Sequence, residues 1–267
     1  NHCTTYKKIK MKRSSNILLL FIGLFLLSFI LPEKKKKIKV WMIGDSTMCI
    51  QPKERYPVTG WGTPFVYFFD STVTIENKAR GGRSTRTFLS EGRWKEVFES
   101  LQEDDYVLMQ FGHNDEAKEP QYQERYTSVP DYKINLIKFI TESRSKKAIP
   151  VLITPVTRMR FDKAGKMEET HIEYSAAVWE IGKEYNTPVI DLDAKSRDLL
   201  QKLGPADSKL LFMQLDSLEH PYYPVGQKDN THFNDYGARL IAQIVLAEIK
   251  NLKLELAERI IKPVVKK

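Results

Sequence analysis

The stretch IKVWMIGDST, residues 38–47, decides the fold, because it joins a buried strand to a polar turn. Residues 38–43 are rich in valine, isoleucine and other apolar residues, and Gly44 ends the run, which is typical of a short strand inside a sheet. Four further runs of this kind follow along the chain, at residues 73–76, 106–110, 149–154 and 188–191. These five runs therefore predict five short strands.

Longer amphipathic stretches separate these strands. The clearest helical patterns cover residues 93–102, 132–145, 171–185 and 235–250. Asn234 is a suitable N-cap for the last helix, and Leu240, Ile244 and Leu246 are expected to form its buried stripe. Strands that alternate with helices predict an α/β fold, a three-layer α/β/α sandwich around a five-stranded parallel sheet. No internal repeat or linker follows Lys39, so residues 38–267 are expected to form one domain.

The positive charge is concentrated at the N-terminus. The formal net charge is +8, yet residues 1–40 contain ten Lys or Arg residues and one acid, and the remainder holds 32 basic and 33 acidic residues. A nucleic-acid-binding domain needs a basic face of its own. The nearly neutral remainder argues against a nucleic-acid partner.

Residues 1–37 are predicted to be a signal peptide or a membrane anchor. An apolar run at residues 17–31 follows Lys12 and Arg13 and precedes Pro32, and it is short for a membrane-spanning helix. No small-x-small cleavage pair follows the run, so an uncleaved anchor remains an alternative to a cleaved signal. The protein is expected to be secreted, periplasmic or tethered to the outer side of a membrane. Cys3 and Cys49 set no disulfide framework.

Polar residues follow the first three predicted strands, at the edge where parallel sheets collect ligand-binding loops. Ser46 follows the first strand, Gly82 belongs to a glycine pair after the second, and Asn114 lies in a G-H-N-D segment after the third. Taken singly, the serine is an ordinary turn residue, the glycines are a flexible turn, and the asparagine is a common helix cap.

A fourth polar segment, D-N-T-H, lies near the C-terminus. The three-residue separation of Asp229 and His232 is expected to place both side chains on the same side of one helical turn. The alternative is a loop acid beside a solvated histidine. No further His or Cys residues cluster around the pair, so no metal site is predicted.

In order, the four segments resemble the four blocks of the SGNH, or GDSL-type, hydrolase superfamily. The blocks here are G-D-S-T, N-K-A-R-G-G-R-S, G-H-N-D and D-N-T-H, between residues 38 and 250. Within that superfamily the chain is most similar to the rhamnogalacturonan acetylesterases, on the basis of Gly60-Trp61-Gly62, Gly82-Arg83-Ser84 and D-N-T-H-F. The resemblance implies a flavodoxin-like SGNH fold and a serine esterase. The protein is expected to be a monomer and to need no cofactor. Its expected substrate is an acetylated plant cell-wall polysaccharide, the rhamnogalacturonan of pectin.

The chemistry of these residues fits an acetyl-serine mechanism. Ser46 needs a base to become a nucleophile, His232 has a suitable ordinary pKa, and Asp229 would orient the imidazole. The resemblance implies an oxyanion hole made by the backbone N–H groups of Ser46 and Gly82 and the side chain of Asn114.

Three further residues are candidate substrate contacts: Trp61, Arg83 and His113. For each there is a structural alternative, because a tryptophan near the first loop is more often core, an arginine is usually solvated or paired, and a histidine beside a catalytic residue is usually structural. Arg83, together with Arg80 and Arg86, would attract an acidic polymer.

Other functions remain open at this stage. The same chemistry would serve acetylated xylan, another glycan or a lipid ester, and the same scaffold would serve a non-catalytic carbohydrate-binding protein. A flavodoxin-like nucleotide binder is disfavoured because the chain lacks both a G-x-G-x-x-G segment and a phosphate-binding P-loop. A standard α/β-hydrolase is disfavoured because no G-x-S-x-G elbow is present.

Overall fold

A five-stranded parallel sheet forms the centre of the protein, whose computed structural model describes residues 35–262. Its strands are β1 (Ile38–Gly44), β2 (Val73–Asn77), β3 (Tyr106–Gln110), β4 (Ile149–Ile153) and β5 (Val189–Ile190). They lie in the order β2-β1-β3-β4-β5, so the chain changes direction across the sheet at β1. The predicted five-stranded parallel sheet is confirmed. Crevices of such sheets form at this switch point, beyond the carboxyl ends of the strands.

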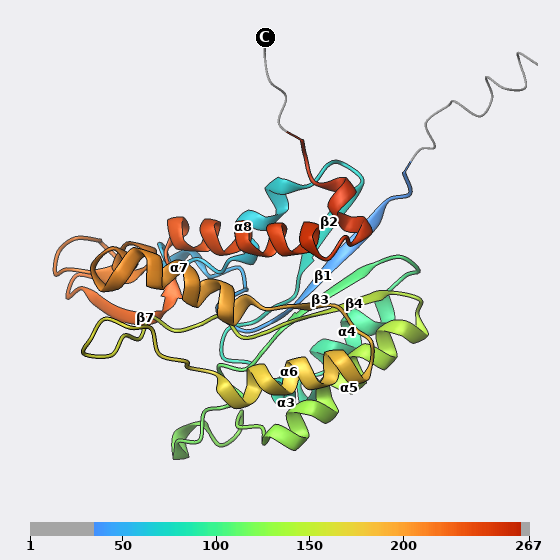
Figure 1. Cartoon of the computed structure of the whole chain (residues 1–267), viewed down its shortest axis with the longest axis horizontal. Coiled ribbons are helices and arrows are strands. Elements are labelled where there is room, and N and C mark those ends of the chain that lie inside the picture. The colour runs from blue at the N-terminus through green and yellow to red at the C-terminus, as the bar shows by residue number, and fades with distance from the viewer. Residues whose placement is uncertain (1–34, 263–267) are drawn as a thin grey trace, which may run out of the picture. The chain divides into compact units, whose positions relative to one another are not determined.

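Helices cover both faces of the sheet, which confirms the predicted three layers (Figure 1). One face packs against α2 (Gly62–Phe65), α7 (Leu192–Asp207) and α8 (Asp235–Asn251). The other packs against α3 (Thr85–Ser90), α4 (Arg93–Ser100), α5 (Val129–Ser145) and α6 (Ile172–Glu184). Short 3₁₀ turns complete the fold: η1 (Lys53–Arg55), η2 (Val66–Phe68), η3 (Pro120–Tyr122), η4 (Ser208–Leu211) and η5 (Glu255–Arg259).

Strand β1 supplies side chains to both cores. Val40 and Met42 belong to the core under α7 and α8, whereas Trp41 and Ile43 belong to the core under α3–α6. All four are at most 3% exposed. This follows from the two-residue period of a strand, which makes a central strand of a covered sheet apolar on both faces.

Helix α8 begins where the sequence predicts. The side chain of Asn234 accepts a hydrogen bond from the N–H of Gly237, as an N-cap does. Of the predicted stripe, Leu246 is buried, whereas Leu240 and Ile244 are only partly buried; the fully buried residues are Ile241, Val245 and Ile249. Each buried aliphatic side chain contributes roughly 1.5–3 kcal/mol, so this stripe fastens α8 to the sheet.

A separate antiparallel hairpin, β6 (Phe212–Leu215) and β7 (Gln227–Phe233), carries the D-N-T-H segment. The expectation of a helical turn is therefore wrong. Phe212 pairs with Phe233, but Met213 pairs with Asp229, so residues 230–232 bulge out of the ladder. Buried Phe212 and Phe233 hold the hairpin in the core, and the bulge turns the intervening residues towards the carboxyl edge of the sheet.

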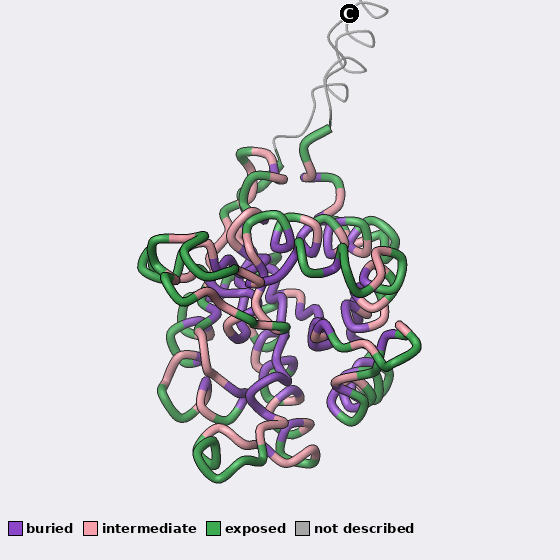
Figure 2. Tube along the Cα trace, turned by 90° about the vertical axis from the view of Figure 1, so that its left-hand side faces the viewer, coloured by how far each residue is buried: buried purple, intermediate pink, exposed green. Residues whose placement is uncertain are grey.

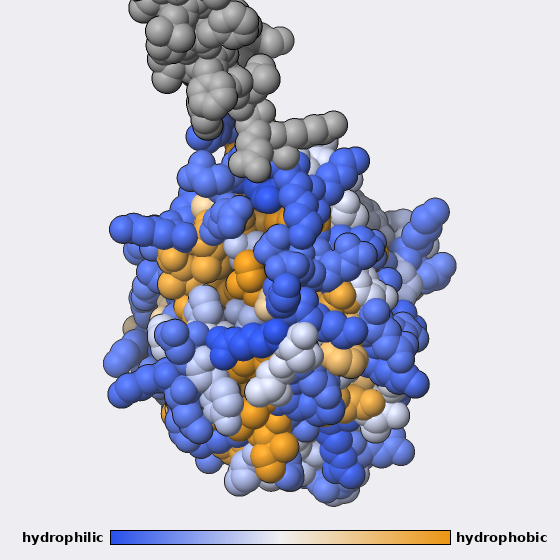
Figure 3. Space-filling view, turned by 90° about the vertical axis from the view of Figure 1, so that its right-hand side faces the viewer, coloured by the Kyte–Doolittle hydropathy of each residue, from blue (hydrophilic) through white to orange (hydrophobic). Residues whose placement is uncertain are grey.

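The layers leave a buried interior enclosed by exposed loops. Figure 2 shows this arrangement from the side on which the strands end, with buried backbone in the middle and exposed segments around it. Figure 3 shows the opposite side, where hydrophilic side chains predominate and apolar ones form separate areas between them. The described residues from 37 onward, 37–262, belong to one compact unit. Within residues 35–262, no helix has the length and apolar character needed to cross a membrane. The predicted signal or anchor run at residues 17–31 lies outside the described residues.

Candidate active site

A buried chain of hydrogen bonds fixes the turn that presents Ser46. Asp45 is fully buried, and its carboxylate accepts from the N–H and the hydroxyl of Thr47, at 2.9 and 2.7 Å. The Thr47 hydroxyl accepts from Gln110 Nε2 at 2.7 Å, and Gln110 Oε1 accepts from Trp61 Nε1 at 2.6 Å. The nucleophile predicted at the end of β1 therefore stands on a rigid polar support.

The structure brings Ser46, His232 and Asp229 together in one relay. His232 Nε2 lies 2.8 Å from Ser46 Oγ, and His232 Nδ1 lies 2.7 Å from Asp229 Oδ2. The other carboxylate oxygen, Oδ1, accepts from the backbone N–H groups of Thr231 and His232, at 2.8 and 3.0 Å. The bulge of β7 thus achieves the contact that the sequence predicted from a helical turn.

The electrostatics of Asp229 suit its place in the relay. Burial raises its pKa, but the hydrogen bond and charge of His232 and the two backbone N–H groups outweigh this, and the pKa falls to about 2. The carboxylate is consequently ionised throughout the neutral range, where it holds a proton on His232 Nδ1 and leaves Nε2 free to accept one.

Three hydrogen-bond donors lie at the serine: the backbone N–H groups of Ser46 and Gly82 and the side-chain amide of Asn114. Gly82 has a φ of 78°, which favours glycine, and a Cβ on Gly81 would lie 3.6 Å from Ser46 Cβ. Within residues 35–262, the N–H groups of Ser46 and Gly82 donate to no other protein group. Asn114 Nδ2 donates to the carbonyl of Arg83 at 3.0 Å, which orients the amide and leaves its second N–H free. These groups are available to stabilise an anion.

These residues line a crevice of about 1060 Å³ at the carboxyl edge of the sheet. Its lining includes Ser46, Gly82, His113, Asn114, Tyr122, Arg125, Arg158, Asp229 and His232. Within residues 35–262, no group of three or more His, Cys, Asp or Glu side chains is arranged to hold a metal ion.

Of the three candidate substrate contacts, only His113 lines the crevice. His113 lines the crevice, its Nε2 donates to the carbonyl of Val156 at 2.9 Å, and burial lowers its pKa well below the ordinary value. Trp61 is fully buried beneath the Ser46 turn and does not reach the crevice, so it cannot contact substrate there. The side chain of Arg83 does not line the crevice, because its guanidinium pairs with Glu91 at 3.0 Å and donates to the carbonyl of Gly81 at 2.9 Å. Neither Arg80 nor Arg86 lines the crevice.

Arg158, which the sequence analysis did not select, ties the D-N-T-H segment to the G-H-N-D segment. Its guanidinium donates to the Thr231 hydroxyl at 2.7 Å and pairs with Glu116 at 3.0 Å. The other oxygen of Glu116 lies 2.9 Å from His171 Nδ1. Arg158 follows β4, so examination of the loop after the fourth strand as well would have found it.

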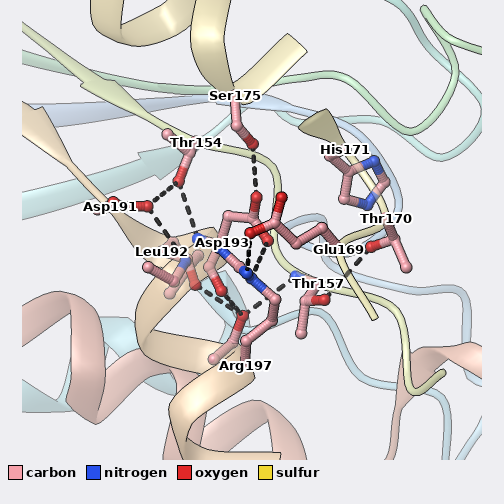
Figure 4. Close-up of polar contacts among 12 residues, drawn as sticks. Thr154, Thr157, Glu169, Thr170, His171, Ser175, Asp191, Leu192, Asp193 and Arg197 are labelled. Atoms are coloured by element: carbon pink, nitrogen blue, oxygen red, sulfur yellow. Dashed lines mark hydrogen bonds and ion pairs between the residues drawn. The ribbon is translucent and has the colours of Figure 1, made fainter. Parts of the chain in front are cut away.

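A polar network around Asp193 anchors the loop that carries Arg158 (Figure 4). The hydroxyl of Thr154 accepts from the N–H of Asp193 at 2.8 Å, and Ser175 donates to its carboxylate at 2.7 Å. Arg197 links Asp193 to Glu169, at 3.2 and 2.7 Å. The network fastens both ends of the loop and thereby fixes Arg158 against β7.

A second buried carboxylate, Asp115, lies next to Asn114. Its raised pKa can be tested through the pH dependence of the free energy of unfolding. One oxygen accepts from the N–H and hydroxyl of Thr85, at 2.9 and 2.6 Å, while the other has no partner among the described residues. Burial raises the pKa of Asp115 to about 7, although the Thr85 hydrogen bonds lower it. Between about pH 4 and pH 7 the folded state binds the extra proton, so this group lowers the free energy of unfolding as pH rises.

Replacement of Asp115 by asparagine is expected to remove that dependence. Relative to wild type, the Asp115→Asn protein should gain up to about 4 kcal/mol in its free energy of unfolding between pH 4 and pH 8. Urea denaturation of both proteins at several pH values measures the difference, with the exposed Asp198→Asn variant as control. Parallel curves for wild type and Asp115→Asn would contradict the assignment.

Comparisons with known proteins show the family of the chain. A model of the GDSL-like lipase/acylhydrolase family matches residues 42–240. The chain is 40% identical over 227 residues to rhamnogalacturonan acetylesterase RhgT of Bacillus subtilis (strain 168), which covers 85% of this chain and 96% of that protein. It is 33% identical to the probable rhamnogalacturonan acetylesterase YesY of the same organism, covering 84% and 97% of the two chains.

Solved structures share the fold. Protein YXIM of Bacillus subtilis superposes with a TM-score of 0.70 and 25% identity over 82% of this chain and 58% of that chain. The acetylxylan esterase Axe2 of Geobacillus stearothermophilus superposes with a TM-score of 0.59 and 21% identity over 80% of this chain and 94% of that chain. The second likeness concerns the fold alone.

Proposed function

The chain belongs to the GDSL-like lipase/acylhydrolase family of SGNH esterases and is a carboxylic ester hydrolase, and from this premise we propose that it removes acetyl groups from rhamnogalacturonan. The similarity to RhgT, which extends over 96% of that protein, supports the choice of substrate. The serine relay supports the choice of mechanism. A plant cell-wall polymer as substrate also fits the export or outer-surface attachment that we propose for residues 1–37.

In the proposed reaction, Ser46 Oγ attacks the acetyl carbonyl carbon while His232 Nε2, 2.8 Å away, takes the serine proton. The tetrahedral intermediate collapses, the bond to the sugar oxygen breaks, and His232 returns the proton to that oxygen. Acetyl-Ser46 remains. Water then attacks it with His232 as base, which releases acetate and restores the serine hydroxyl.

Negative charge develops on the carbonyl oxygen at both tetrahedral stages. The free N–H groups of Ser46 and Gly82 and the second N–H of Asn114 are proposed to stabilise it. Such donors act in place, without reorganisation, and therefore favour the transition state over the ground state.

The single observation that carries the proposal is the relay in which one imidazole contacts both a serine hydroxyl and an ionised carboxylate. The test is acetate release from acetylated rhamnogalacturonan, with acetylated xylan and a small acetyl ester alongside. We expect the highest kcat/KM on rhamnogalacturonan. Faster hydrolysis of acetylated xylan would reassign the substrate, and no hydrolysis of any acetyl ester would refute the function.

Replacement of Asn114 by alanine tests the oxyanion hole. The variant should lose about 10²–10³-fold in turnover, which corresponds to about 3–4 kcal/mol, because one of three donors is removed. KM should change little, since the ground-state carbonyl binds the donor weakly. Steady-state kinetics on a small acetyl ester measures both values. Wild-type turnover in a folded Asn114→Ala protein would exclude the role.

A further inference from the structure

Among the positively charged side chains that line the crevice, Arg125 has neither an ion pair nor a side-chain hydrogen bond with any residue of 35–262. Arg158 pairs with Glu116, Arg160 with Glu168 at 3.8 Å, and Lys118 with Glu173 at 3.9 Å. In contrast, no acidic side chain of residues 35–262 forms an ion pair with Arg125. Arg55, also at the crevice, instead donates to the amide oxygen of Gln51 at 3.2 Å.

Arg125 lies directly beside the proposed oxyanion hole. Its Nη1 would be 3.6 Å from a Cβ built on Gly82. The Nε atom is buried and has no hydrogen-bond partner among the described residues. No described residue accepts a hydrogen bond from the guanidinium, so Nη1, beside Gly82, is available to an anionic ligand in the crevice.

The guanidinium is also held in place before any ligand arrives. Its Cζ lies 3.8 Å from the centre of the Tyr122 ring, which restrains the plane of the group. The backbone turns tightly here, because the N–H of Arg125 donates to the carbonyl of Tyr122 at 3.0 Å. A fixed planar guanidinium matches the two oxygens of a carboxylate and loses little entropy on binding.

From these contacts we propose that Arg125 binds the carboxylate of a uronic acid residue next to the acetylated position. This site rests on the proposed function, since it is defined relative to an acetyl group bound at Ser46. It makes Arg125 the residue that selects an acidic polymer over a neutral one. The attraction that the sequence analysis ascribed to Arg80, Arg83 and Arg86 is thereby assigned to a different arginine, inside the crevice.

Two substrates that differ only in charge provide the test. One is acetylated rhamnogalacturonan, and the other is the same polymer after chemical reduction of its uronic acid carboxyl groups to alcohols. In wild type, kcat/KM should be higher for the acidic polymer. The Arg125→Gln variant should lose about 10–100-fold in kcat/KM on the acidic polymer, mainly through KM, as expected for one charge-assisted pair. Its kcat/KM on the reduced polymer and on a small neutral acetyl ester should stay within threefold of wild type.

Two further variants separate recognition from support of the loop. Arg125→Lys keeps the charge but loses the planar fork, so it should restore part of the preference for the acidic polymer. Arg86→Gln removes an arginine that bonds the carbonyl of Tyr126 in the same loop but lies outside the crevice, and it should preserve the preference.

An equal loss on acidic, reduced and small substrates in Arg125→Gln would show a structural role and overturn the proposal. Unchanged kinetics in that variant would overturn it as well, and in both cases the acetylesterase function would stand. If wild type hydrolyses the small ester but neither polymer, the proposed polysaccharide substrate fails together with the site.

Discussion

Replacement of Ser46 by alanine is expected to lower turnover by about 10⁶-fold. The hydroxyl 2.8 Å from His232 Nε2 is the only atom of residue 46 that forms a covalent bond in the proposed reaction. Without it, catalysis retains only the contributions of the oxyanion hole and of substrate binding. The fold should survive, because the turn is held by Asp45, Thr47 and Gln110 and not by the serine side chain.

Two measurements check this expectation. Initial rates of acetate release give the loss of turnover, and a fluorophosphonate probe shows whether residue 46 is the labelled nucleophile. Ser90→Ala, at an exposed serine of α3, is the matched control and should behave as wild type. If Ser46→Ala retains more than about a hundredth of wild-type turnover while folded, another group is the nucleophile.

Replacement of Asp229 by asparagine should lower turnover by about 10⁴-fold, through the tautomer of His232. The backbone N–H groups of Thr231 and His232 both donate to Oδ1, so this position requires an acceptor. Asparagine would place its oxygen there and would turn its NH₂ group towards His232 Nδ1. Nδ1 must then accept, the ring proton moves to Nε2, and Nε2 can no longer take the proton of Ser46.

The kinetic signature of this variant is specific. kcat should fall while KM stays near its wild-type value, because the change acts on the proton transfer through His232 and not on substrate binding. Asp216→Asn changes an exposed acid between β6 and β7 and should leave the rate unchanged. A rate for Asp229→Asn within tenfold of wild type would show that another group orients the imidazole.

The central sheet could be predicted from the sequence because its inner strands, such as β1 and β3, are apolar on both faces and the strands are followed by turn residues. The hairpin of β6 and β7 was missed since its strands enclose a polar loop with Pro221, Pro224 and Gly226 and carry little alternation. Helix α7 was missed partly because Gly204, with a φ of 72°, and Pro205 interrupt its pattern. In both cases contacts with other elements outweigh local preference.

The candidate active site, like the fold, could be predicted only in part. The convergence of Ser46, Gly82 and Asn114 followed from parallel strands that end at one edge. The pairing of Asp229 with His232 was predicted from a helical turn, whereas the bulge of β7 produces it. The directions of side chains could not be predicted. Trp61 points into the core and Arg83 points to Glu91, whereas Arg125 and Arg158 enter the crevice from loops whose paths depend on distant contacts.

The bulge in β7 has a mechanical consequence. Asp229 and His232 belong to one short bulge whose two ends are held by the hairpin ladder, whereas Ser46 lies in the turn after β1 of the central sheet. A small displacement of the hairpin therefore carries acid and base together and lengthens the gap between imidazole and hydroxyl. The enzyme would lose activity through separation of His232 from Ser46 before the hairpin or the central sheet lost its own structure.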